Sequence, residues 1–249
     1  MEQRLRNKVG IVTGATSGMG RAIAQMFFDH GAKLVLSGRN VASGTALAST
    51  LPNTVFKAGD VCNADYNQQL VQTALETFGQ VDIVSCNAGI LGLGNVVDLP
   101  AEVWHKTLDT NVTAIYHLAK YALPHLGKTR GNLLVNASIA AFKSFPNHPA
   151  YCASKAAALA LTKQLAVEYA PEVRVNALCP GPVDTPLLWD SAKAFENPDI
   201  AVKNAAEATL IKRLGSPEDV AQLALFLVSE EASWITGTAV TIDGGIINT

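Results

Sequence analysis

The chain of 249 residues contains few charged residues, 16%, and few aromatic ones, 6%, and its net charge at pH 7 is only −2. It has no block of like charges and no basic patch, which argues against a nucleic-acid partner. It also has no apolar run long enough to cross a bilayer, because Lys163 interrupts the longest one, which begins after Lys155. A membrane-spanning protein is therefore not expected.

Cysteine is scarce too, with four residues that form no C-x-x-C pair and lie in or beside apolar runs. That pattern favours buried free thiols in a reducing compartment over disulfides or zinc. The five histidines show no ligand spacing, so no metal is expected. Residues 1–8 are polar and lack an apolar signal segment, which predicts a cytoplasmic location.

The chain is rich, by contrast, in short apolar segments that alternate with longer helical patterns. Expected strands cover residues 9–13, 34–36, 55–56, 81–84, 133–135, 173–175 and 239–242, and expected helices cover 19–28, 64–78, 101–123, 150–169 and 217–228. This alternation is typical of βαβ units, and uninterrupted apolar strands fit a sheet that is covered on both faces. We therefore expect one domain over residues 1–249, a doubly wound α/β Rossmann fold with about seven parallel strands.

Two segments of this chain point to ligands. Residues 13–20 read Thr-Gly-Ala-Thr-Ser-Gly-Met-Gly between the first strand and the first helix, where glycines and a helix N-terminus suit a pyrophosphate. Residues 184–212 follow the sixth strand and mix Leu187, Leu188 and Trp189 with prolines and charges. A long insertion at that edge of the sheet predicts a substrate lid.

Tyr151 and Lys155 are four residues apart on an expected helix, so their side chains share one face. A tyrosine has an ordinary pKa of about 10 and is a poor base near neutrality. A nearby ammonium favours the phenolate and lowers that pKa. The pair predicts a general acid and base for alcohol oxidation or ketone reduction, although Y-x-x-x-K alone is common on exposed helix faces.

The glycine spacing resembles that of the short-chain dehydrogenase/reductase family, in its Tyr-x-x-x-Lys branch, and the likeness extends along nearly the whole chain. Asp60-Val61, Asn87-Ala88-Gly89 and the segment 180–185 resemble further motifs of that family. The resemblance implies an oxidoreductase that acts on CH–OH and C=O groups with a nicotinamide cofactor. The catalytic residues it implies are Asn111, Ser138, Tyr151 and Lys155; from the residues alone, Asn111 reads as an ordinary helix residue.

The resemblance and the glycine turn together predict the cofactor contacts. They are Gly14, Thr16, Ser17, Gly18, Met19, Gly20, Ser37, Arg39, Asp60, Val61, Asn87, Ala88, Gly89, Tyr151, Lys155, Pro180, Gly181, Val183 and Thr185. An acidic residue that would favour NAD is missing at Gly38, and Arg39 follows it, which predicts a preference for NADP(H). The alternative is that Arg39 is a solvated loop cation and that NAD(H) is the cofactor. It stays open because many NADP-preferring relatives carry an Arg or Lys at the position of Ser17.

The expected substrate contacts are Ala140, Phe142, His148, Leu187 and Leu188. For His148, two interpretations stay equally open: the side chain lines the substrate pocket, or it only packs in the core. Because these residues are mostly apolar, we expect a small neutral ketone or secondary alcohol. An NAD-dependent alcohol dehydrogenase and a 3-oxoacyl-type reductase with an acyl-carrier partner are alternatives within the family. A methyltransferase and a non-catalytic scaffold are alternatives outside it. Small and apolar residues around the helices 101–123 and 150–169 predict that a partner covers them. The resemblance to the family implies a homotetramer, with a dimer as runner-up.

Overall fold

The computed structural model describes residues 3–249 and contains one parallel sheet in the strand order β3-β2-β1-β4-β5-β6-β7. The strands are β1 (Val9–Val12), β2 (Lys33–Gly38), β3 (Thr54–Ala58), β4 (Ile83–Cys86), β5 (Asn132–Asn136), β6 (Arg174–Pro180) and β7 (Ala239–Ile242). The order reverses direction between β1 and β4, where crevices form in sheets of this kind. The predicted doubly wound α/β fold is confirmed.

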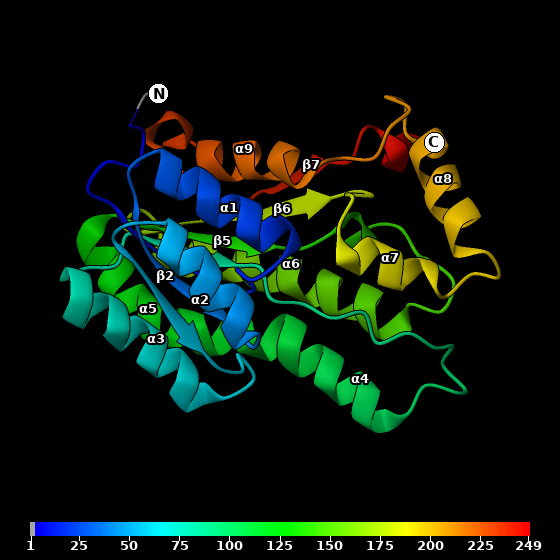
Figure 1. Cartoon of the computed structure of the whole chain (residues 1–249), viewed down its shortest axis with the longest axis horizontal. Coiled ribbons are helices and arrows are strands. Elements are labelled where there is room, and N and C mark those ends of the chain that lie inside the picture. The colour runs from blue at the N-terminus through cyan, green and yellow to red at the C-terminus, as the bar shows by residue number, and fades with distance from the viewer. Residues whose placement is uncertain (1–2) are drawn as a thin grey trace.

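Helices cover both faces of the sheet (Figure 1). They are α1 (Gly18–Asp29), α2 (Val41–Thr50), α3 (Ala64–Phe78), α4 (Ala101–Leu108), α5 (Ala114–Thr129), α6 (Pro149–Tyr169), α7 (Pro186–Ala192), α8 (Pro198–Ala208) and α9 (Pro217–Val228). Helices α1, α2 and α9 pack on one face, and α3, α5 and α6 pack on the other. Within residues 3–249, no helix is long and apolar enough to cross a membrane.

Side chains alternate between the two faces of each strand, and this alternation divides the core. Ile11 packs with the α3–α5–α6 cluster and its neighbour Val12 with the α1–α9 cluster. In β5, Leu133 and Leu134 divide in the same way. Because both faces of every central strand are buried, nearly all strand positions must be apolar, which explains the unbroken apolar runs in the sequence.

Three local expectations need correction. The helix expected over 101–123 is interrupted by a π-helical turn, η1 (Asp109–Thr113), so that α4 and α5 are separate helices. Helix α2 was not expected, because its small and hydroxyl-bearing residues carry almost no amphipathic pattern. The sixth strand runs to Pro180 rather than ending at Val175, and it thereby reaches the ligand-binding edge.

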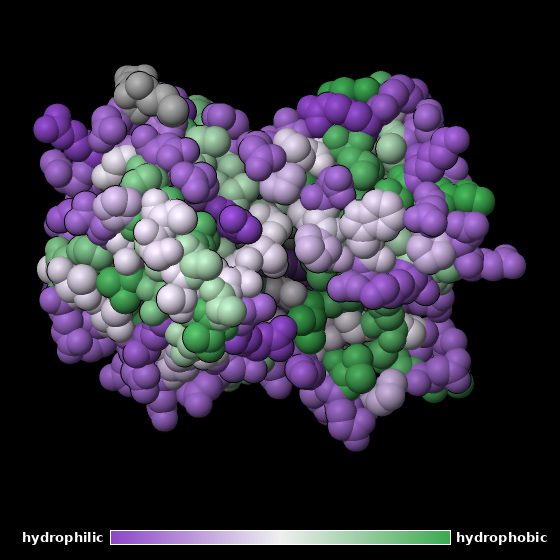
Figure 2. All heavy atoms as spheres, viewed as in Figure 1, coloured by the Kyte–Doolittle hydropathy of each residue, from purple (hydrophilic) through white to green (hydrophobic). Residues whose placement is uncertain are grey.

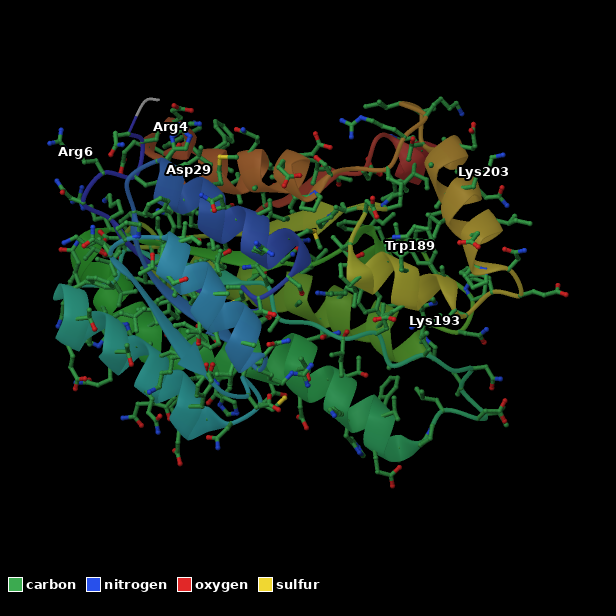
Figure 3. All side chains as sticks on the ribbon, viewed as in Figure 1. Arg4, Arg6, Asp29, Trp189, Lys193 and Lys203 are labelled. Carbon is green, nitrogen blue, oxygen red and sulfur yellow. The ribbon has the colours of Figure 1, made fainter. Side chains whose placement is uncertain are left out.

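Residues 184–212, the expected lid (called the lid segment below), form helices α7 and α8, which stand beyond the carboxyl ends of β6 and β7 (Figure 1). Figure 2 shows the surface hollowed between this pair and the side of the molecule that carries α1 and α2. Trp189 on α7, Lys193 directly after α7 and Lys203 on α8 are labelled in Figure 3, and all three side chains are exposed. Two cavities open into the hollow.

Candidate active site

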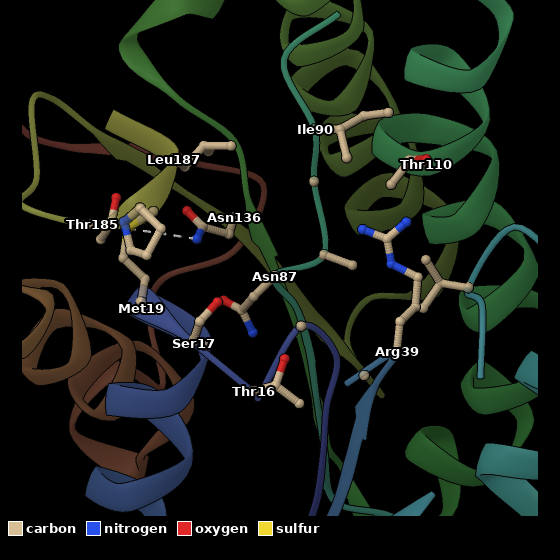
Figure 4. A pocket seen from close by; sticks show the side chains of 18 of the residues that line it. Thr16, Ser17, Met19, Arg39, Asn87, Ile90, Thr110, Asn136, Thr185 and Leu187 are labelled. Carbon is tan, nitrogen blue, oxygen red and sulfur yellow. Dashed lines mark hydrogen bonds between the residues drawn. The ribbon is translucent and has the colours of Figure 1, made fainter. Parts of the chain in front are cut away.

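The larger cavity, of about 540 Å³, lies beyond the carboxyl ends of the neighbouring strands β1 and β4, where the strand order reverses. Its walls come from the glycine turn after β1, the end of β2, the segment after β4 and the start of α7. The predicted cofactor contacts that line it are Gly14, Thr16, Ser17, Gly18, Met19, Gly20, Arg39, Asp60, Val61, Asn87, Ala88, Gly89 and Thr185. Figure 4 shows this cavity from close by.

The turn after β1 needs glycine at two positions. Gly14 has a φ of +63°, a left-handed conformation that side chains disfavour. At Gly20, a Cβ atom would lie 2.3 Å from the carbonyl oxygen of Gly14. These glycines let helix α1 start immediately against the turn, so that its first N–H groups face the cavity.

The polar groups around this cavity fit a dinucleotide. The N-cap Ser17 makes no side-chain cap to α1, so the first-turn N–H groups and the positive end of the helix dipole remain for an anion. Deeper in, the buried Oδ1 atoms of Asn87 and Asn136 have no partner among the described residues. Both are acceptors at the cavity wall, as ribose hydroxyls require.

At the far end of the cavity, Arg39 extends its guanidinium toward the helix that carries Thr110 (Figure 4). It is exposed, and within residues 3–249 no carboxylate forms an ion pair with it. Asp60 lies on the same wall; a hydrogen bond from the backbone of Cys62 lowers the pKa of its carboxyl, and the charge of Arg39 adds to this. The Arg39 end therefore offers a positive charge to a ligand.

Ser37 is not a cofactor contact, and that prediction was wrong. Its side chain is fully buried, and its hydroxyl lies 2.9 Å from the hydroxyl of Tyr66. Tyr66 itself donates to the carbonyl of Lys57, so Ser37 is the donor in this pair. The Ser37 side chain therefore points to Tyr66 of α3, and it does not line the cavity that Gly38 and Arg39 line.

The catalytic candidates converge at the carboxyl end of β5. Ser138 follows that strand, and Tyr151 and Lys155 come from the first turns of α6. The Nζ atom of Lys155 lies 5.6 Å from the centre of the Tyr151 ring and donates to the carbonyl of Asn136 at 2.7 Å. A Cβ on Gly89 would lie 3.5 Å from the same Nζ, which places the ammonium against the larger cavity.

Burial dominates the electrostatics of this cluster. It raises the pKa of Tyr151 to about 12, against a hydrogen bond with Ser138 that lowers it. Burial also lowers the pKa of Lys155 to about 8. The expected lowering of the tyrosine pKa is therefore absent from the protein alone, because desolvation of the phenolate outweighs the hydrogen bond with Ser138. At neutral pH the phenol keeps its proton, as a proton donor to a carbonyl requires.

Asn111 lies in the π-helical turn η1 and its side chain is fully engaged. Its Oδ1 accepts from the backbone N–H of Ile90 at 2.9 Å, while its Nδ2 donates to the Ile90 carbonyl and to Ser154, each at 2.9 Å. The amide thus joins the segment after Gly89 to the helix that carries Tyr151 and Lys155. Asn111 is a positioning residue in this arrangement, and π-helical turns of this kind gather at functional sites.

The second cavity, of about 400 Å³, adjoins the first, since Leu91 lines both. Ser138 and Tyr151 face it. Of the predicted substrate contacts, Ala140, His148 and Leu188 line it, whereas Leu187 lines the larger cavity instead. Phe142 lines neither cavity and is 52% exposed, so that prediction was wrong: the short 3₁₀ turn η2 (Ile139–Ala141) carries the chain outward before it.

Sequence reasoning missed much of this second cavity. Phe195, Val202 and Ala205 of the lid segment line it, and so does Ile246 near the C-terminus. Lys143 donates to the carbonyl of Ile246 at 3.2 Å, which holds that residue in place. No charged side chain among residues 3–249 lines the cavity.

The predicted cofactor contacts in residues 180–185 lie in different surroundings. Gly181 lines the second cavity and Thr185 the larger one, while Val183 is buried in a crevice beside Gly215 and Pro180 ends β6. Within the described part of the chain, no group of three or more His, Cys, Asp or Glu side chains is arranged to hold a metal.

Comparisons with known proteins agree with this geometry. Residues 14–247 match a family model described as enoyl-(acyl carrier protein) reductase. The chain is 39% identical to the human dehydrogenase/reductase SDR family member 4, over 97% of this chain and 88% of the relative. It is 37% identical to an uncharacterized oxidoreductase of Thermotoga maritima, over 96% and 97% of the two chains, and 36% identical to the oxidoreductase UcpA of Salmonella typhimurium, over 97% and 95%.

Among solved structures, the ligand-free aldohexose dehydrogenase of Thermoplasma acidophilum superimposes with a TM-score of 0.92 at 32% sequence identity. The match covers 100% of this chain and 97% of that one. The likeness therefore extends over the whole chain, from the sheet to residues 184–212, rather than over a shared nucleotide-binding half.

Proposed function

The chain belongs to the short-chain dehydrogenase/reductase family of nicotinamide-dependent oxidoreductases, and on that premise we propose that it transfers a hydride between NADP(H) and a small neutral ketone or secondary alcohol. The observation that carries the proposal is the second cavity. Ser138 and Tyr151 face an otherwise largely apolar space in which no lining residue is charged. Such a wall favours a neutral substrate and penalises a carboxylate, which would lose its hydration without gaining a partner.

Each side chain has a defined part in this reaction. Ser138 and Tyr151 hold the carbonyl oxygen, and Tyr151 gives it a proton. Lys155 binds ribose hydroxyls and stabilises the tyrosinate that remains, and Asn111 fixes the helix on which both stand. The nicotinamide, when bound, supplies the hydride to the carbonyl carbon. Oxidation of an alcohol uses the same groups in reverse, with Tyr151 as the base.

The preference for NADP(H) rests on the end of β2. Gly38 supplies no carboxylate to accept from a ribose and repel a 2′-phosphate, and Arg39 lies there without an ion-pair partner among the described residues. A guanidinium is well suited to a phosphate. We expect Arg39→Ala to weaken NADP binding by roughly 1.5–3 kcal/mol, the range of a charge-assisted hydrogen bond, with NAD as the internal comparison.

The complementary substitution is Gly38→Asp, and it requires a second change. A Cβ on Gly38 would lie 2.5 Å from Cγ2 of Thr16 but 3.4 Å from its Cβ, so Thr16→Ala makes room. We expect the double variant Thr16→Ala/Gly38→Asp to prefer NAD, with Thr16→Ala alone as the matched control. If the wild-type enzyme is as efficient with NAD as with NADP, this assignment of the β2 end is wrong, and the NAD-dependent alcohol dehydrogenase becomes the better proposal.

A 3-oxoacyl-type reductase finds less support. Its acyl-carrier partner would need a basic surface near the substrate cavity, and the residues suggested for it are Lys128 and Arg130. They precede β5, at the amino edge of the sheet, whereas Ser138 and the cavity lie beyond its carboxyl edge.

The decisive experiment for the whole proposal is a turnover screen of ketones and secondary alcohols with both cofactors. Complete inactivity despite cofactor binding would overturn it and favour the scaffold alternative.

A further inference from the structure

One polar pair stands out in the second cavity. His148 is 2% exposed and lies at the N-terminal end of α6, three residues before Tyr151. Its Nε2 atom is 2.8 Å from the hydroxyl of Ser191, on the lid helix α7. Both residues line the cavity, where the other polar side chains are Ser138, Tyr151 and the exposed Asn204.

The tautomer of His148 follows from its other nitrogen. Nδ1 lies 2.6 Å from the carbonyl oxygen of Pro146, and a carbonyl oxygen only accepts hydrogen bonds. In the neutral imidazole the proton is therefore on Nδ1, and Nε2 accepts the hydroxyl proton of Ser191. The pair then holds three lone pairs, one on Nε2 and two on the serine oxygen, and a single proton to share among them.

Because the pair has more acceptor lone pairs than protons, it favours a ligand that donates a hydrogen bond. A substrate hydroxyl donates to the serine oxygen, or takes the place of Ser191 as the donor to Nε2, and both nitrogen and oxygen stay satisfied. A second carbonyl oxygen offers no proton, and Ser191 would have to abandon Nε2 to reach it. The pair therefore recognises a hydrogen-bond donor, and a polar pair of which His148 is buried and Ser191 partly buried discriminates against a ligand that leaves it unmatched.

The pair also lies close to the reacting end of the cavity. The ring centres of His148 and Tyr151 are 6.2 Å apart, and the rings meet edge to face. A substrate whose carbonyl oxygen is held by Tyr151 and Ser138 therefore brings a nearby carbon to His148. We infer that the substrate is a hydroxy ketone, or in reverse a diol, whose second hydroxyl stands close to the reacting carbon and binds the His148–Ser191 pair.

This inference rests on the proposed carbonyl chemistry, and its test uses ligands matched in shape. The first pair is 1-hydroxy-2-butanone and 3-pentanone, in which a methyl group replaces the hydroxyl. The second is 4-hydroxy-2-butanone and 2-pentanone, with the hydroxyl one carbon further away. The acceptor-only compound is 2,3-pentanedione. In the wild-type protein we expect kcat/KM to be about 10- to 100-fold higher for the better hydroxy ketone than for its alkyl partner.

Two variants separate recognition from folding. In His148→Asn the amide nitrogen keeps a donor for the Pro146 carbonyl and no acceptor replaces Nε2. In His148→Gln the amide oxygen stands near the position of Nε2. We expect the ratio of kcat/KM between hydroxy and alkyl ketones to fall toward one in His148→Asn and to recover in part in His148→Gln. A tether that only holds α7 in place would change both substrates together and leave the ratio unaltered.

Binding is read separately from turnover, by saturation-transfer NMR of each ketone with NADP⁺ present. Hydroxyl-dependent binding without turnover of any ketone would refute the proposed reaction, and with it the hydroxy ketone as substrate, but would keep the recognition of a hydroxyl by the His148–Ser191 pair. Turnover with an equal or greater preference for 3-pentanone, 2-pentanone or 2,3-pentanedione would overturn the inference and keep the reaction. Absence of both turnover and hydroxyl-dependent binding would overturn both.

Discussion

Lys155 should make the ligand-free protein less stable than a variant that lacks its charge. The side chain is 5% exposed, and burial lowers its pKa from 10.5 to about 8. At about 1.4 kcal/mol per pH unit, this difference corresponds to about 3 kcal/mol of unfavourable free energy for holding the ammonium in the native state. Its hydrogen bond to the Asn136 carbonyl offsets part of that cost. Lys155→Met should therefore stabilise the protein by about 1–2 kcal/mol at pH 7.

The sign of the pH dependence follows from proton binding. Below pH 8 the lysine is protonated in both states, and the full cost is present. Between pH 8 and 10.5 the unfolded chain still binds a proton that the native protein has released, so stability rises with pH. Tyr151 acts in the opposite direction, because its pKa is raised from 10 to about 12, but only above pH 10. The thiols of Cys86 and Cys179 also oppose Lys155 within the window from pH 7 to 10, because burial raises their pKa from 9.0, so the contribution of Lys155 is read from a variant that lacks it.

The assay is urea unfolding of the ligand-free protein at fixed concentration, at several pH values in that window. The quantity of interest is the difference in unfolding free energy between wild type and Lys155→Met, in which titrations that are not coupled to Lys155 cancel. Cys179 is coupled to it, because the charge of Lys155 lowers the pKa of that thiol. Lys163→Met serves as the control, because Lys163 lies exposed on the same helix. The reasoning is refuted if Lys155→Met is no more stable than the wild type at pH 7, or if the difference does not shrink toward pH 10.

Three further outcomes are expected. Tyr151→Phe should lower turnover by roughly 100-fold or more while the cofactor still raises the melting temperature, and a variant with most of its activity left would contradict the role of the phenol. Light scattering at micromolar concentration should give a tetramer, since Tyr116 on α5 and Val167 on α6 are 50% and 81% exposed, and a monomer would exclude it. Hydrogen exchange should be fastest over residues 186–210 without ligand and slow on binding; protection equal to that of the sheet would count against a lid.

The fold could be predicted because its signals are local. A short stretch of sequence is enough to identify each of its main elements, namely the apolar strands, the glycine turn and the amphipathic helices α1, α3 and α9. Tyr151 and Lys155 were accessible for the same reason, since a spacing of four on a helix places both on one face. Helix α2 escaped because its stability comes from contacts with β2 and β3 and not from its own pattern.

The parts of the site that escaped prediction depend on distant contacts. Ser37 seemed a phosphate donor until Tyr66, almost thirty residues later, was seen to accept its hydroxyl. Ile246 lines the second cavity, and its carbonyl accepts a hydrogen bond from Lys143, about a hundred residues earlier. Phe142 was misplaced by the short turn η2, whose geometry no residue spacing reveals. Side-chain direction in loops is set by partners that a linear pattern does not contain.

The strand order determines how fast this protein unfolds as well as where it binds its ligand. Gly14, Asn87 and Asn136 meet at one cavity because β1, β4 and β5 are neighbours in the sheet, although long crossovers separate them in the chain. A ligand that touches all three binds only after those strands have paired. Its binding energy therefore does not stabilise the folding transition state. Ligand binding leaves the folding rate almost unchanged and slows unfolding. The lifetime of the folded chain in a cell thus follows the cellular supply of its dinucleotide.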